Sequence, residues 1–416
     1  MLAFWFAIPF WQRVLGALVL GIIAGLVLGE AATVLKPLGT LFINAIKMLV
    51  VPLVLFALIT SITSLADNQK MGRLAGKTIG LFLFTAFIAS LIGLTIGSLM
   101  NWGDALQLTA SEVRERTIPP VADVITGLIP TNPVAALVNG NVLQIIIFAS
   151  LVGIAINVVG EKAEPMKKVI HAGAEIMYQI TRMVMQLTPL GVFGLMAWAI
   201  GSFGLATLLP LSKFIIAIYI ACFIHIIVVY GGLVKLFGGI GIRAFFKAVL
   251  PAQLVAYSSA SSYGTLPVSY KVVTEDLKVA KSYASFVLPL GATINMDGCG
   301  GIFPAIAAIF IAHIYGIPLD TLDYLLIAGT ATLASVGTAG VPGTAMVMLT
   351  VTLSVVGLPL EGIAFIAAVD RIIDMMRTAT NVTGDTMVAL VIGRSEGLVN
   401  EAAQPDMPDT AAAVTR

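Results

Sequence analysis

Residues 369–385 read VDRIIDMMRTATNVTGD and place five ionisable side chains in one short segment. The flanking stretches, EGIAFIAA before it and TMVALVI after it, have the apolar composition of a membrane helix. A charged residue at the centre of a bilayer costs about 2.5–3.5 kcal/mol on insertion scales. Five such residues together therefore indicate a functional site rather than an incidental cluster.

On a helix each residue advances by about 100°, so the polar residues of this segment fall within an arc of about 80°. The stripe contains Asp370, Asp374, Arg377, Asn381 and Asp385, and the opposite side contains Ile372, Met376, Ala379 and Val382. The pattern predicts an amphipathic membrane helix whose polar face meets protein or a cavity. The alternative is an ion-pair network that only fixes helix packing.

The acidic residues of the apolar regions outnumber the basic ones. Four carboxylates stand against two guanidinium groups: Asp297, Asp370, Asp374 and Asp385 against Arg371 and Arg377. In a poorly solvated interior the surplus must be protonated or matched by cations. Oxygen ligands suit hard cations, which leaves monovalent cations, protons or a substrate ammonium group. An Arg on the same face matches a carboxylate, so an amino acid would satisfy both kinds of group.

The composition is that of a polytopic membrane protein. Of 416 residues, 58% are hydrophobic and 11% charged, and runs of about 20 apolar residues span a bilayer. Such runs lie near 14–29, 40–65, 77–100, 142–160, 174–202, 210–238, 283–316, 321–356 and 360–393. The net charge of +1 gives no indication of nucleic acid, and two cysteines imply no disulfide framework. We expect the first run to be retained as a helix and residues 395–416 to be a disordered tail.

Three polar or glycine-rich breaks interrupt the later apolar runs. SSYGTLPVS at 261–269 and SVGTAGVPG at 335–343 share Ser-x-Gly-Thr followed by Pro. Exposed backbone is tolerated in lipid only beside protein or water, so each is predicted to be the tip of a re-entrant hairpin at a transporter's midplane site. Ordinary turns outside the membrane are the alternative. GATINMDGCGG at 291–301 is predicted to unwind a helix at its middle.

These residues resemble a known family, the dicarboxylate/amino acid:cation symporters, which include sodium-coupled glutamate and aspartate transporters. The resemblance runs from IKMLVVPLV at 46–54, through the three breaks, to DMMRTATNVTGD at 374–385. It implies an all-α fold of eight transmembrane helices and two oppositely directed re-entrant hairpins arranged as inverted repeats. It also implies a homotrimer in the plasma (cell inner) membrane with both termini cytoplasmic, and a transport domain that moves like an elevator.

The resemblance divides the chain into a scaffold and a transport domain. The scaffold would comprise 1–70 with helices 1 and 2, and 103–205 with helices 4 and 5. The transport domain would comprise helix 3 at 71–102 and, at 206–394, helices 6 to 8 with both hairpins. The loops rich in Lys and Arg near 70–77, 162–168, 235–247 and 271–281 would face the cytoplasm.

The resemblance also implies roles for individual residues. Asp374 would bind the substrate ammonium group and Arg377 a side-chain carboxylate, with the rest of the substrate held by Thr378, Asn381, Ser262 and Val341. Three sodium sites would follow. The first has Asp385 with carbonyls of Gly291, Asn295 and Asn381; the second has Thr293 with carbonyls of Ser335, Val336 and Thr338; the third has Asn295, Asp297 and Thr85.

This chain departs from the family pattern at several positions. Ala260 stands where many members carry Arg at the first hairpin tip, and Arg371 supplies an equivalent charge. Ala86 and Phe82 replace the Ser and Tyr of many sodium-coupled members beside the third site, so at least two sodium ions per substrate are expected, with the third open. After NMDG the chain reads CGGIFPA, which resembles the family's cystine-transporting branch.

The sequence therefore predicts a sodium-coupled symporter for aspartate or glutamate. A cystine or C4-dicarboxylate symporter of the same family, or proton coupling, is the alternative. An intramembrane aspartyl protease would be expected to show Gly-x-Gly-Asp, whereas NVTGD has only the last Gly-Asp. A channel would build rings of like groups around a pore, so we expect neither a channel nor an enzyme. His171, His225 and His313 are interpreted as helix or interface residues.

Overall fold

A computed structural model of the chain describes residues 8, 10–63, 72–102, 129–204, 208–338, 340 and 343–399. All the elements in these ranges are helical, apart from one isolated antiparallel bridge between Val279 and Val399. The first half contains α2 (Phe10–Leu28), the 3₁₀ turn η1 (Gly29–Leu35), α3 (Lys36–Thr63), α4 (Gly72–Leu99), α6 (Pro133–Asn139), α7 (Val142–Val159), the 3₁₀ turn η2 (Gly160–Ala163), α8 (Glu164–Met185) and α9 (Thr188–Phe203).

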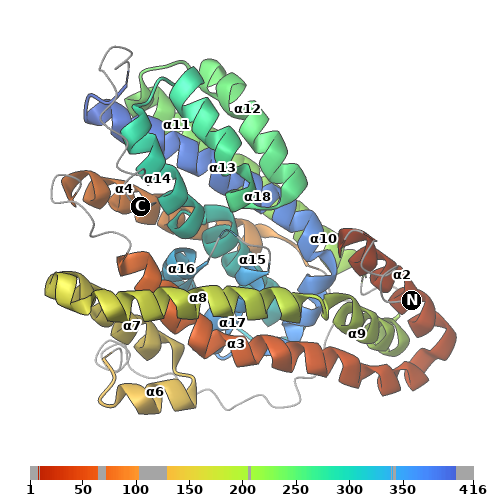
Figure 1. The fold of residues 1–416 in the computed structure, drawn as a ribbon. Helices are drawn as coiled ribbons and strands as arrows, with labels where there is room; N and C mark the ends of the chain where they lie inside the picture. Colours follow the sequence, from red (N-terminus) through yellow and green to blue (C-terminus); the bar gives the residue numbers. More distant parts are fainter. Residues whose placement is uncertain are drawn as a thin grey trace.

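The second half contains several π-helical turns between its α-helices. Its elements are α10 (Leu208–Ile224), η4 (His225–Tyr230), α11 (Gly231–Leu233), η5 (Val234–Gly238), α12 (Ile242–Ser259), α13 (Ser262–Lys271), η6 (Val272–Asp276), α14 (Lys281–Ile294), η7 (Asp297–Ile302), α15 (Phe303–Ile314), α16 (Thr321–Gly337), α17 (Thr344–Val355), the 3₁₀ turn η8 (Leu360–Gly362) and α18 (Ile363–Ser395). Figure 1 shows α18 running diagonally beside α12, α13 and α14 to α10.

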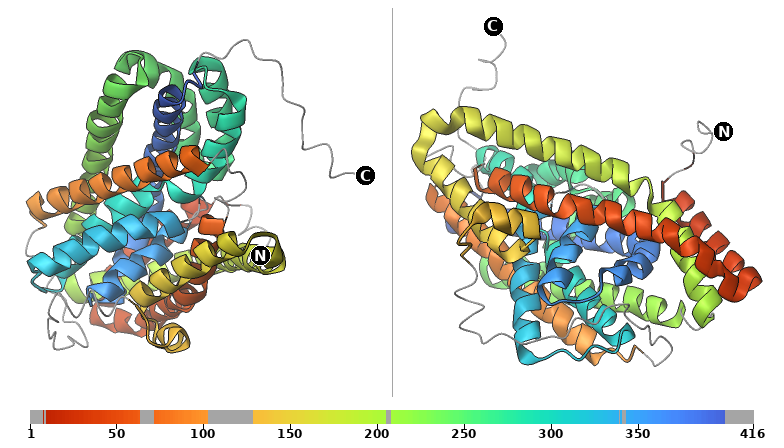
Figure 2. Two further views of the ribbon diagram at one scale, coloured as in Figure 1. Left: turned by 90° about the vertical axis from the view of Figure 1, so that its left-hand side faces the viewer. Right: turned by 90° about the horizontal axis from the view of Figure 1, so that it is seen from below.

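The N-terminal helices pack closely because glycines remove side chains from their contacts. α2 carries GIIAG at 21–25, and a Cβ added at Gly21 would lie 2.8 Å from the carbonyl oxygen of Phe193. A Cβ at Gly25 would lie 2.7 Å from that of Ala197, so this face of α2 admits only glycine against α9. Small residues four apart are typical of helix packing in membranes. Figure 2 shows α3 and α8 side by side along one face of the molecule.

Two helices stand where the sequence analysis predicts the single run 174–202. α8 ends at Met185 and α9 begins at Thr188, and Pro189 lies in the first turn of α9. Proline lacks an N–H donor and is tolerated at a helix start, so it begins a new helix here. The prediction of a single membrane-spanning helix over 174–202 was therefore wrong. α8 is amphipathic, with buried residues such as Ala174 and Tyr178 on one side and charged residues on the other.

Both predicted hairpins are helix–turn–helix pairs. In the first, α12 ends at Ser259, Ala260 takes a left-handed conformation with φ of 50°, and the Ser261 side chain caps α13. The turn is thus shorter than the predicted stretch 261–269, because Ser261 accepts a hydrogen bond from the amide of Gly264 and starts the next helix at once. In the second, the turn lies between the C-terminus of α16 and the N-terminus of α17.

The two hairpin tips meet beside α14. A Cβ added at Gly340 would lie 2.5 Å from the carbonyl oxygen of Ala292 and 3.0 Å from Cβ of Ser262. The tip of the second hairpin therefore contacts the start of α13 and the end of α14 at backbone distance. Glycine at 340 is what allows this approach, since any side chain would collide with Ala292.

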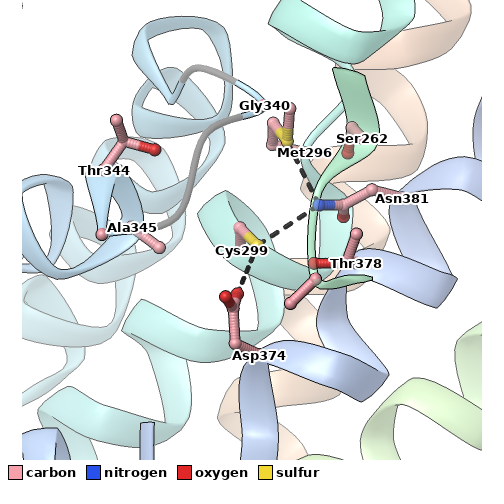
Figure 3. A pocket seen from close by; sticks show the side chains of 11 residues that line it. Ser262, Met296, Cys299, Gly340, Thr344, Ala345, Asp374, Thr378 and Asn381 are labelled. Atoms are coloured by element: carbon pink, nitrogen blue, oxygen red, sulfur yellow. Dashed lines mark hydrogen bonds between the residues drawn. The ribbon is translucent and has the colours of Figure 1, made fainter. Parts of the chain in front are cut away.

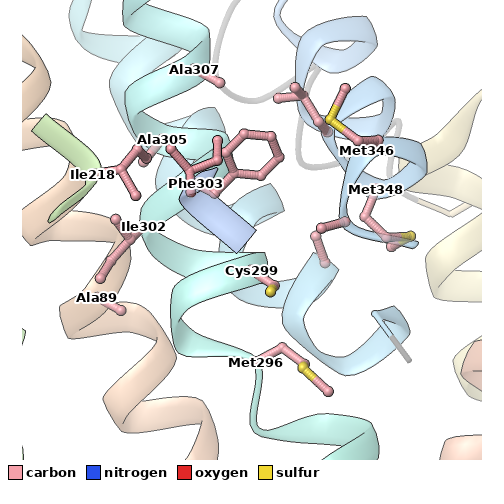
Figure 4. Packing of buried hydrophobic residues seen from close by; sticks show 14 of the residues in the cluster. Ala89, Ile218, Met296, Cys299, Ile302, Phe303, Ala305, Ala307, Met346 and Met348 are labelled. Carbon is pink, nitrogen blue, oxygen red and sulfur yellow. The ribbon is translucent and has the colours of Figure 1, made fainter. Parts of the chain in front are cut away.

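The predicted break in GATINMDGCGG is confirmed. α14 ends at Ile294, Asn295 and Met296 leave helical geometry, and the π-helical turn η7 leads into α15. The glycines of η7 let neighbours approach closely: a Cβ at Gly300 would lie 2.3 Å from Cα of Ser335. In Figure 4, Ile302 lies on the side of Ala89, while Cys299 lies on the side of Met348.

The outer surface carries many exposed apolar side chains. Val27, Leu99 and Val158 are 78%, 78% and 82% exposed, which in water would be unfavourable over so wide a face. Among the described residues, five helical stretches are long and apolar enough to cross a membrane: Gln12–Thr60, Arg73–Leu99, Gln144–Met185, Leu209–Gly238 and Lys281–Ile314. The all-α prediction is confirmed.

The end of α18 is held by contacts beyond the helix. Leu398 accepts a hydrogen bond from the amide of Ala280 at 2.8 Å, and Val399 pairs with Val279. Residues 395–399, assigned to a disordered tail from their polarity, are instead folded, because their backbone groups pair with the segment before α14. Residues 400–416 of that predicted tail lie outside the described residues.

Candidate substrate and cation site

Arg377 is the centre of an ion-pair network on α18. Its Nη2 donates to Oδ1 of Asp370 at 2.6 Å and to Oδ1 of Asp374 at 3.0 Å. The spacings of seven and three residues put these groups on one face of the helix, as the stripe predicts. The Arg377 side chain is 1% exposed, and its guanidinium carbon lies 4.0 Å from the ring centroid of Phe303. The ring face adds a favourable cation–π contact.

Two of the Arg377 nitrogens have no partner. Nε and Nη1 are buried and make no hydrogen bond within the described part of the chain. An unpaired buried donor is costly, so each of these two nitrogens would be stabilised by an acceptor, and a carboxylate oxygen is a strong one.

Arg371 lies beside the stripe and reaches the first hairpin. Its Nη2 is 3.3 Å from the carbonyl oxygens of both Ser258 and Ser259 at the C-terminus of α12. A guanidinium there offsets the partial negative charge of the helix end. Arg371 thus places a positive charge next to Ala260, as the sequence comparison with the family predicts.

A small cavity opens next to this network and is lined by α18, η7 and both hairpin tips. Figure 3 shows Asp374 and Asn381 facing Cys299 and Met296 across it. Its lining is made by Ala260, Ser262, Met296, Cys299, Gly340, Gly343, Thr344, Ala345, Asp374, Thr378 and Asn381.

Asn381 organises the wall of the cavity. Its Nδ2 lies 3.1 Å from Sδ of Met296 and 3.2 Å from Sγ of Cys299, and its Oδ1 accepts the amide of Gly298 at 2.7 Å. Cys299 Sγ is also 3.9 Å from Oδ1 of Asp374. One sulfur atom, Sγ of Cys299, therefore contacts both the carboxylate and the amide of the candidate site.

The structure brings most of the predicted substrate residues together. Ser262, Asp374, Thr378 and Asn381 all line the cavity. Arg377 does not line it, because its guanidinium is turned to Asp370, Asp374 and the Phe303 ring. Val341 lies outside the described residues.

The residues predicted for the first sodium site surround Asp385. Nδ2 of Asn295 donates to Oδ1 of Asp385 at 2.9 Å. A Cβ added at Gly291 would lie 2.4 Å from the same oxygen, so the backbone of α14 lies directly on the carboxylate. Asn381 is one turn earlier on the same face of α18.

The residues predicted for the second site lie at the end of α16. Ser335, Val336 and Thr338 occupy its last turn and C-cap, and the amide of Thr338 donates to the carbonyl of Ser335. Thr293 follows Ala292 near the end of α14. The carbonyl oxygen of Ala292 lies close to Gly340 in the second hairpin, which begins with α16. α14, which carries Thr293, therefore packs on α16 and on the second hairpin tip, although the Thr293 hydroxyl donates to the Pro289 carbonyl.

The third predicted set joins α4 to the broken helix. Thr85 is fully buried on α4, and its hydroxyl donates to the carbonyl of Phe82 at 3.1 Å. Ala89, one turn later on the same face, is 2.8 Å from a Cβ added at Gly301 of η7. Thr85 therefore lies on the side of α4 that faces η7, the turn that begins with Asp297.

Two buried oxygens of this set have no donor. Oδ1 of Asn295 and Oδ1 of Asp297 make no hydrogen bond in the described structure. Unpaired acceptors of this kind fit a hard cation, which needs only oxygen ligands.

Sequence reasoning missed three residues around these groups. Met296 contacts Asn381 in the cavity. His225 Nε2 lies 3.0 Å from Oδ2 of Asp297, and the hydroxyl of Tyr230 donates to the same oxygen at 2.7 Å. The interpretation of His225 as a satisfied helix or interface residue is consistent with this contact but did not identify Asp297 as the partner. The signal available was a lone His in the apolar run 210–238, which by itself does not identify a partner.

Comparison with known proteins identifies the chain's relatives. The model of the sodium:dicarboxylate symporter family matches residues 10–395. A proton/sodium-glutamate symport protein of Geobacillus stearothermophilus is 36% identical over 94% of this chain and 95% of its own length.

Further relatives differ in their named substrates. A proton/glutamate-aspartate symporter of Escherichia coli (strain K12) is 35% identical over 93% of this chain and 92% of its own length. A C4-dicarboxylate transport protein of Azorhizobium caulinodans is 33% identical over 92% of this chain and 88% of its own length. All of these relatives are transporters and none is an enzyme. The chain therefore belongs to the sodium:dicarboxylate symporter family.

Proposed function

We infer that this symporter takes up an acidic amino acid, aspartate or glutamate, together with sodium ions. The observation that carries the proposal is the neighbourhood of Asp374, which faces the cavity, and Arg377, which has two unpaired donors. A carboxylate in the cavity wall suits an ammonium group, and the unpaired Arg377 nitrogens suit a carboxylate. An acidic amino acid carries both groups and leaves a second carboxylate for Thr378, Asn381 and Ser262.

The unpaired oxygens support sodium as the coupled ion. Asn295 Oδ1 and Asp297 Oδ1 are buried without donors, and Asp385 is buried between α14 and α18. A hard monovalent cation would neutralise each carboxylate and supply the missing partner. Glutamate relatives are named for both proton and sodium coupling, so the choice between the two ions is the part that an experiment must decide.

Two alternative substrates follow from specific observations. Cystine is favoured by Cys299 in the cavity wall, 3.9 Å from Oδ1 of Asp374, within the stretch CGGIFPA that resembles the cystine-transporting branch. A C4-dicarboxylate is favoured by relatives of that name. A C4-dicarboxylate has no ammonium group to pair with Asp374, which is why an amino acid is preferred here.

The proposal includes a mechanism and an assembly. Eight transmembrane helices and two re-entrant hairpins would form a scaffold at 1–70 and 103–205 and a transport domain at 71–102 and 206–394. The transport domain would carry substrate and sodium across the membrane as an elevator, within a homotrimer of the cell inner membrane with both termini cytoplasmic. The contact of both hairpin tips with the cavity supports their role as gates, the second tip being the outer one.

Uptake into proteoliposomes tests this function. We expect labelled aspartate to accumulate against its gradient when sodium is imposed outside, with at least two sodium ions per substrate. Unlabelled glutamate should compete, whereas serine should not. Full uptake in sodium-free buffer with only an inward proton gradient would reject sodium coupling. Strong competition by cystine alone, or by succinate alone, would replace the acidic amino acid by that alternative.

A further inference from the structure

Asp297 is held by two residues of a helix to which no ligand role has been assigned. His225 and Tyr230 both contact its Oδ2, at 3.0 Å and 2.7 Å. All three side chains are fully buried. The two rings pack edge to face with centroids 4.5 Å apart, so the histidine and the tyrosine form one rigid unit around a single oxygen.

A π-helical turn makes this arrangement possible. His225 and Tyr230 are five residues apart, and in an α-helix residues five apart point in different directions. They are the first and last residues of η4, whose wider turn brings both to the same side. π-helical turns inside α-helices occur frequently at functional sites. Asp297 itself begins a second π-helical turn, η7.

The other carboxylate oxygen of Asp297 remains available as a cation ligand. Oδ1 of Asp297 has no partner within the described structure, and neither has Oδ1 of Asn295. A Cβ added at Gly384 would lie 2.6 Å from the Tyr230 hydroxyl and 2.7 Å from Nδ2 of Asn295. Tyr230 and Asn295 therefore both lie against Gly384, the residue of α18 directly before Asp385.

We propose that His225 and Tyr230 are positioning residues that set the sodium affinity of the site at Asp297. Both donors hold Oδ2, which fixes the carboxylate so that Oδ1 and the Asn295 oxygen present one preformed pair of ligands. Ligating carboxylates that are themselves hydrogen-bonded bind metals more tightly, because outer partners fix their orientation. This inference rests on the proposed sodium coupling.

The arrangement also accounts for the departures from the family pattern at the same site. Phe82 and Ala86 bring no hydroxyl from α4, so fewer ligands are available to define the geometry. A rigidly held carboxylate compensates for a smaller ligand set, since less orientational freedom is lost on binding.

The test compares sodium titrations of three variants in the full-length protein. Tyr230→Phe removes only the hydroxyl, His225→Leu removes the imidazole donor, and His225→Gln retains a donor at a similar reach. Labelled aspartate uptake gives the half-saturating sodium concentration. Sodium-dependent thermal stabilisation of the detergent-purified protein gives a second, transport-independent measure.

We expect the half-saturating sodium concentration to rise about tenfold in Tyr230→Phe, the order expected for a lost hydrogen bond to a charged group. His225→Leu should behave alike, and His225→Gln should remain near the unmodified value. At saturating sodium the KM for aspartate should stay unchanged. A purely structural role would instead lower thermal stability without sodium and leave the sodium titration in place.

Tyr219→Phe is the matched control, because its hydroxyl lies on the same helix but donates to the carbonyl of Ile372 at 2.9 Å. It should leave the sodium titration unchanged. An unchanged or lower half-saturating sodium concentration in Tyr230→Phe overturns the proposal while leaving sodium coupling intact. If the unmodified protein shows no sodium dependence in either assay, sodium coupling and this inference fail together.

Discussion

Arg377 and Asp374 are joined by a hydrogen bond of 3.0 Å one turn apart on α18, at the edge of the cavity. The same guanidinium nitrogen also bonds Asp370 at 2.6 Å. The residue predicted to bind the substrate's carboxylate is thus already paired with the residue predicted to bind its ammonium group. An acidic amino acid bound between them would replace the Arg377–Asp374 ion pair by two ion pairs with the substrate, one to each residue. The network would then select the substrate as well as hold the helices together.

Replacing Arg377 with Thr should change substrate choice. The KM for aspartate is expected to rise about a hundredfold, because the loss of one partner of a buried carboxylate costs about 3–5 kcal/mol. Small neutral amino acids such as serine should then compete for uptake, since Asp374 still holds the ammonium group. Competition of labelled aspartate uptake by glutamate, cystine, succinate and serine measures both effects.

The control for this exchange is Arg371→Thr, which removes a neighbouring guanidinium that contacts the first hairpin instead. It should leave the ranking of competitors unchanged. If serine already competes as well as aspartate in the unmodified protein, Arg377 does not select the substrate.

Cys299 provides a chemical probe of the cavity. The chain has two cysteines, and Cys299 lines the cavity whereas Cys222 is buried in α10. A small thiol reagent such as methanethiosulfonate ethylammonium should abolish uptake, and aspartate should slow the reaction by occupying the same space. Cys299→Ser should resist the reagent, whereas Cys222→Ser should remain sensitive. A sensitive Cys299→Ser protein together with a resistant Cys222→Ser protein would place the reactive thiol outside the cavity.

The packing of the broken helix on the second hairpin predicts a strong effect at Gly300. An added methyl group would lie 2.3 Å from Cα of Ser335, so Gly300→Ala should lower stability by about 1–3 kcal/mol through overpacking. Gly329→Ala is the control, because a Cβ there meets nothing within 4 Å and alanine favours a helix over glycine. Thermal unfolding in detergent compares the two. A stable Gly300→Ala protein would contradict the described contact.

Periodicity could predict the parts of the site that depend on one helix. The polar stripe from Asp370 to Asp385 follows from a spacing of three or four residues, and α18 has that face buried against its neighbours. The break at Asn295 and Met296 follows from local chemistry, since Asn, Asp and Gly disfavour a continuous helix. These features are set by neighbours in the chain.

The features that the sequence did not predict depend on contacts between distant segments. The direction of the Arg377 side chain depends on the competition between Asp370, Asp374 and the ring of Phe303 on α15. The contact of His225 with Asp297 depends on a π-helical turn, and a five-residue spacing gives no recognisable face in a helical pattern. Neither can be read from hydrophobic periodicity.

A charged contact connects the end of α18 to the start of α4. Glu396 accepts a hydrogen bond from Arg73 at 2.6 Å and a second one from Lys77. These two donors lower the pKa of the Glu396 carboxyl below its ordinary value. A lowered folded-state pKa stabilises the protein above the ordinary pKa of glutamate, and this contribution is lost as the pH falls through the folded-state value.

Glu396→Gln should therefore lower the melting temperature slightly at pH 7. The difference from the unmodified protein should shrink below about pH 4.3, the ordinary pKa of a glutamate, because the unmodified carboxyl then becomes protonated as well. It should also shrink in high salt, which screens exposed charges. Melting temperatures at pH 7 and pH 4, each at low and high salt, measure this. A difference that is the same at both pH values would exclude an ionic contribution.

Asp385 should be the carboxylate most sensitive to substitution in sodium coupling. It belongs to α18 and faces α14, where Asn295 donates a hydrogen bond to its Oδ1. Because Gly291 has no side chain, the backbone of α14 lies directly against the same oxygen. Asp385→Asn removes the negative charge with little change in shape, so the half-saturating sodium concentration for aspartate uptake should rise at least about tenfold, the order of one lost charge-assisted contact. Asp320→Asn is the matched control, because Asp320 caps the far end of α16 and asparagine caps a helix equally well. Its sodium titration should match that of the unmodified protein. If Asp385→Asn also matches it, the first sodium site does not include Asp385, and the coupling ion must be sought at the unpaired oxygens of Asn295 and Asp297 instead.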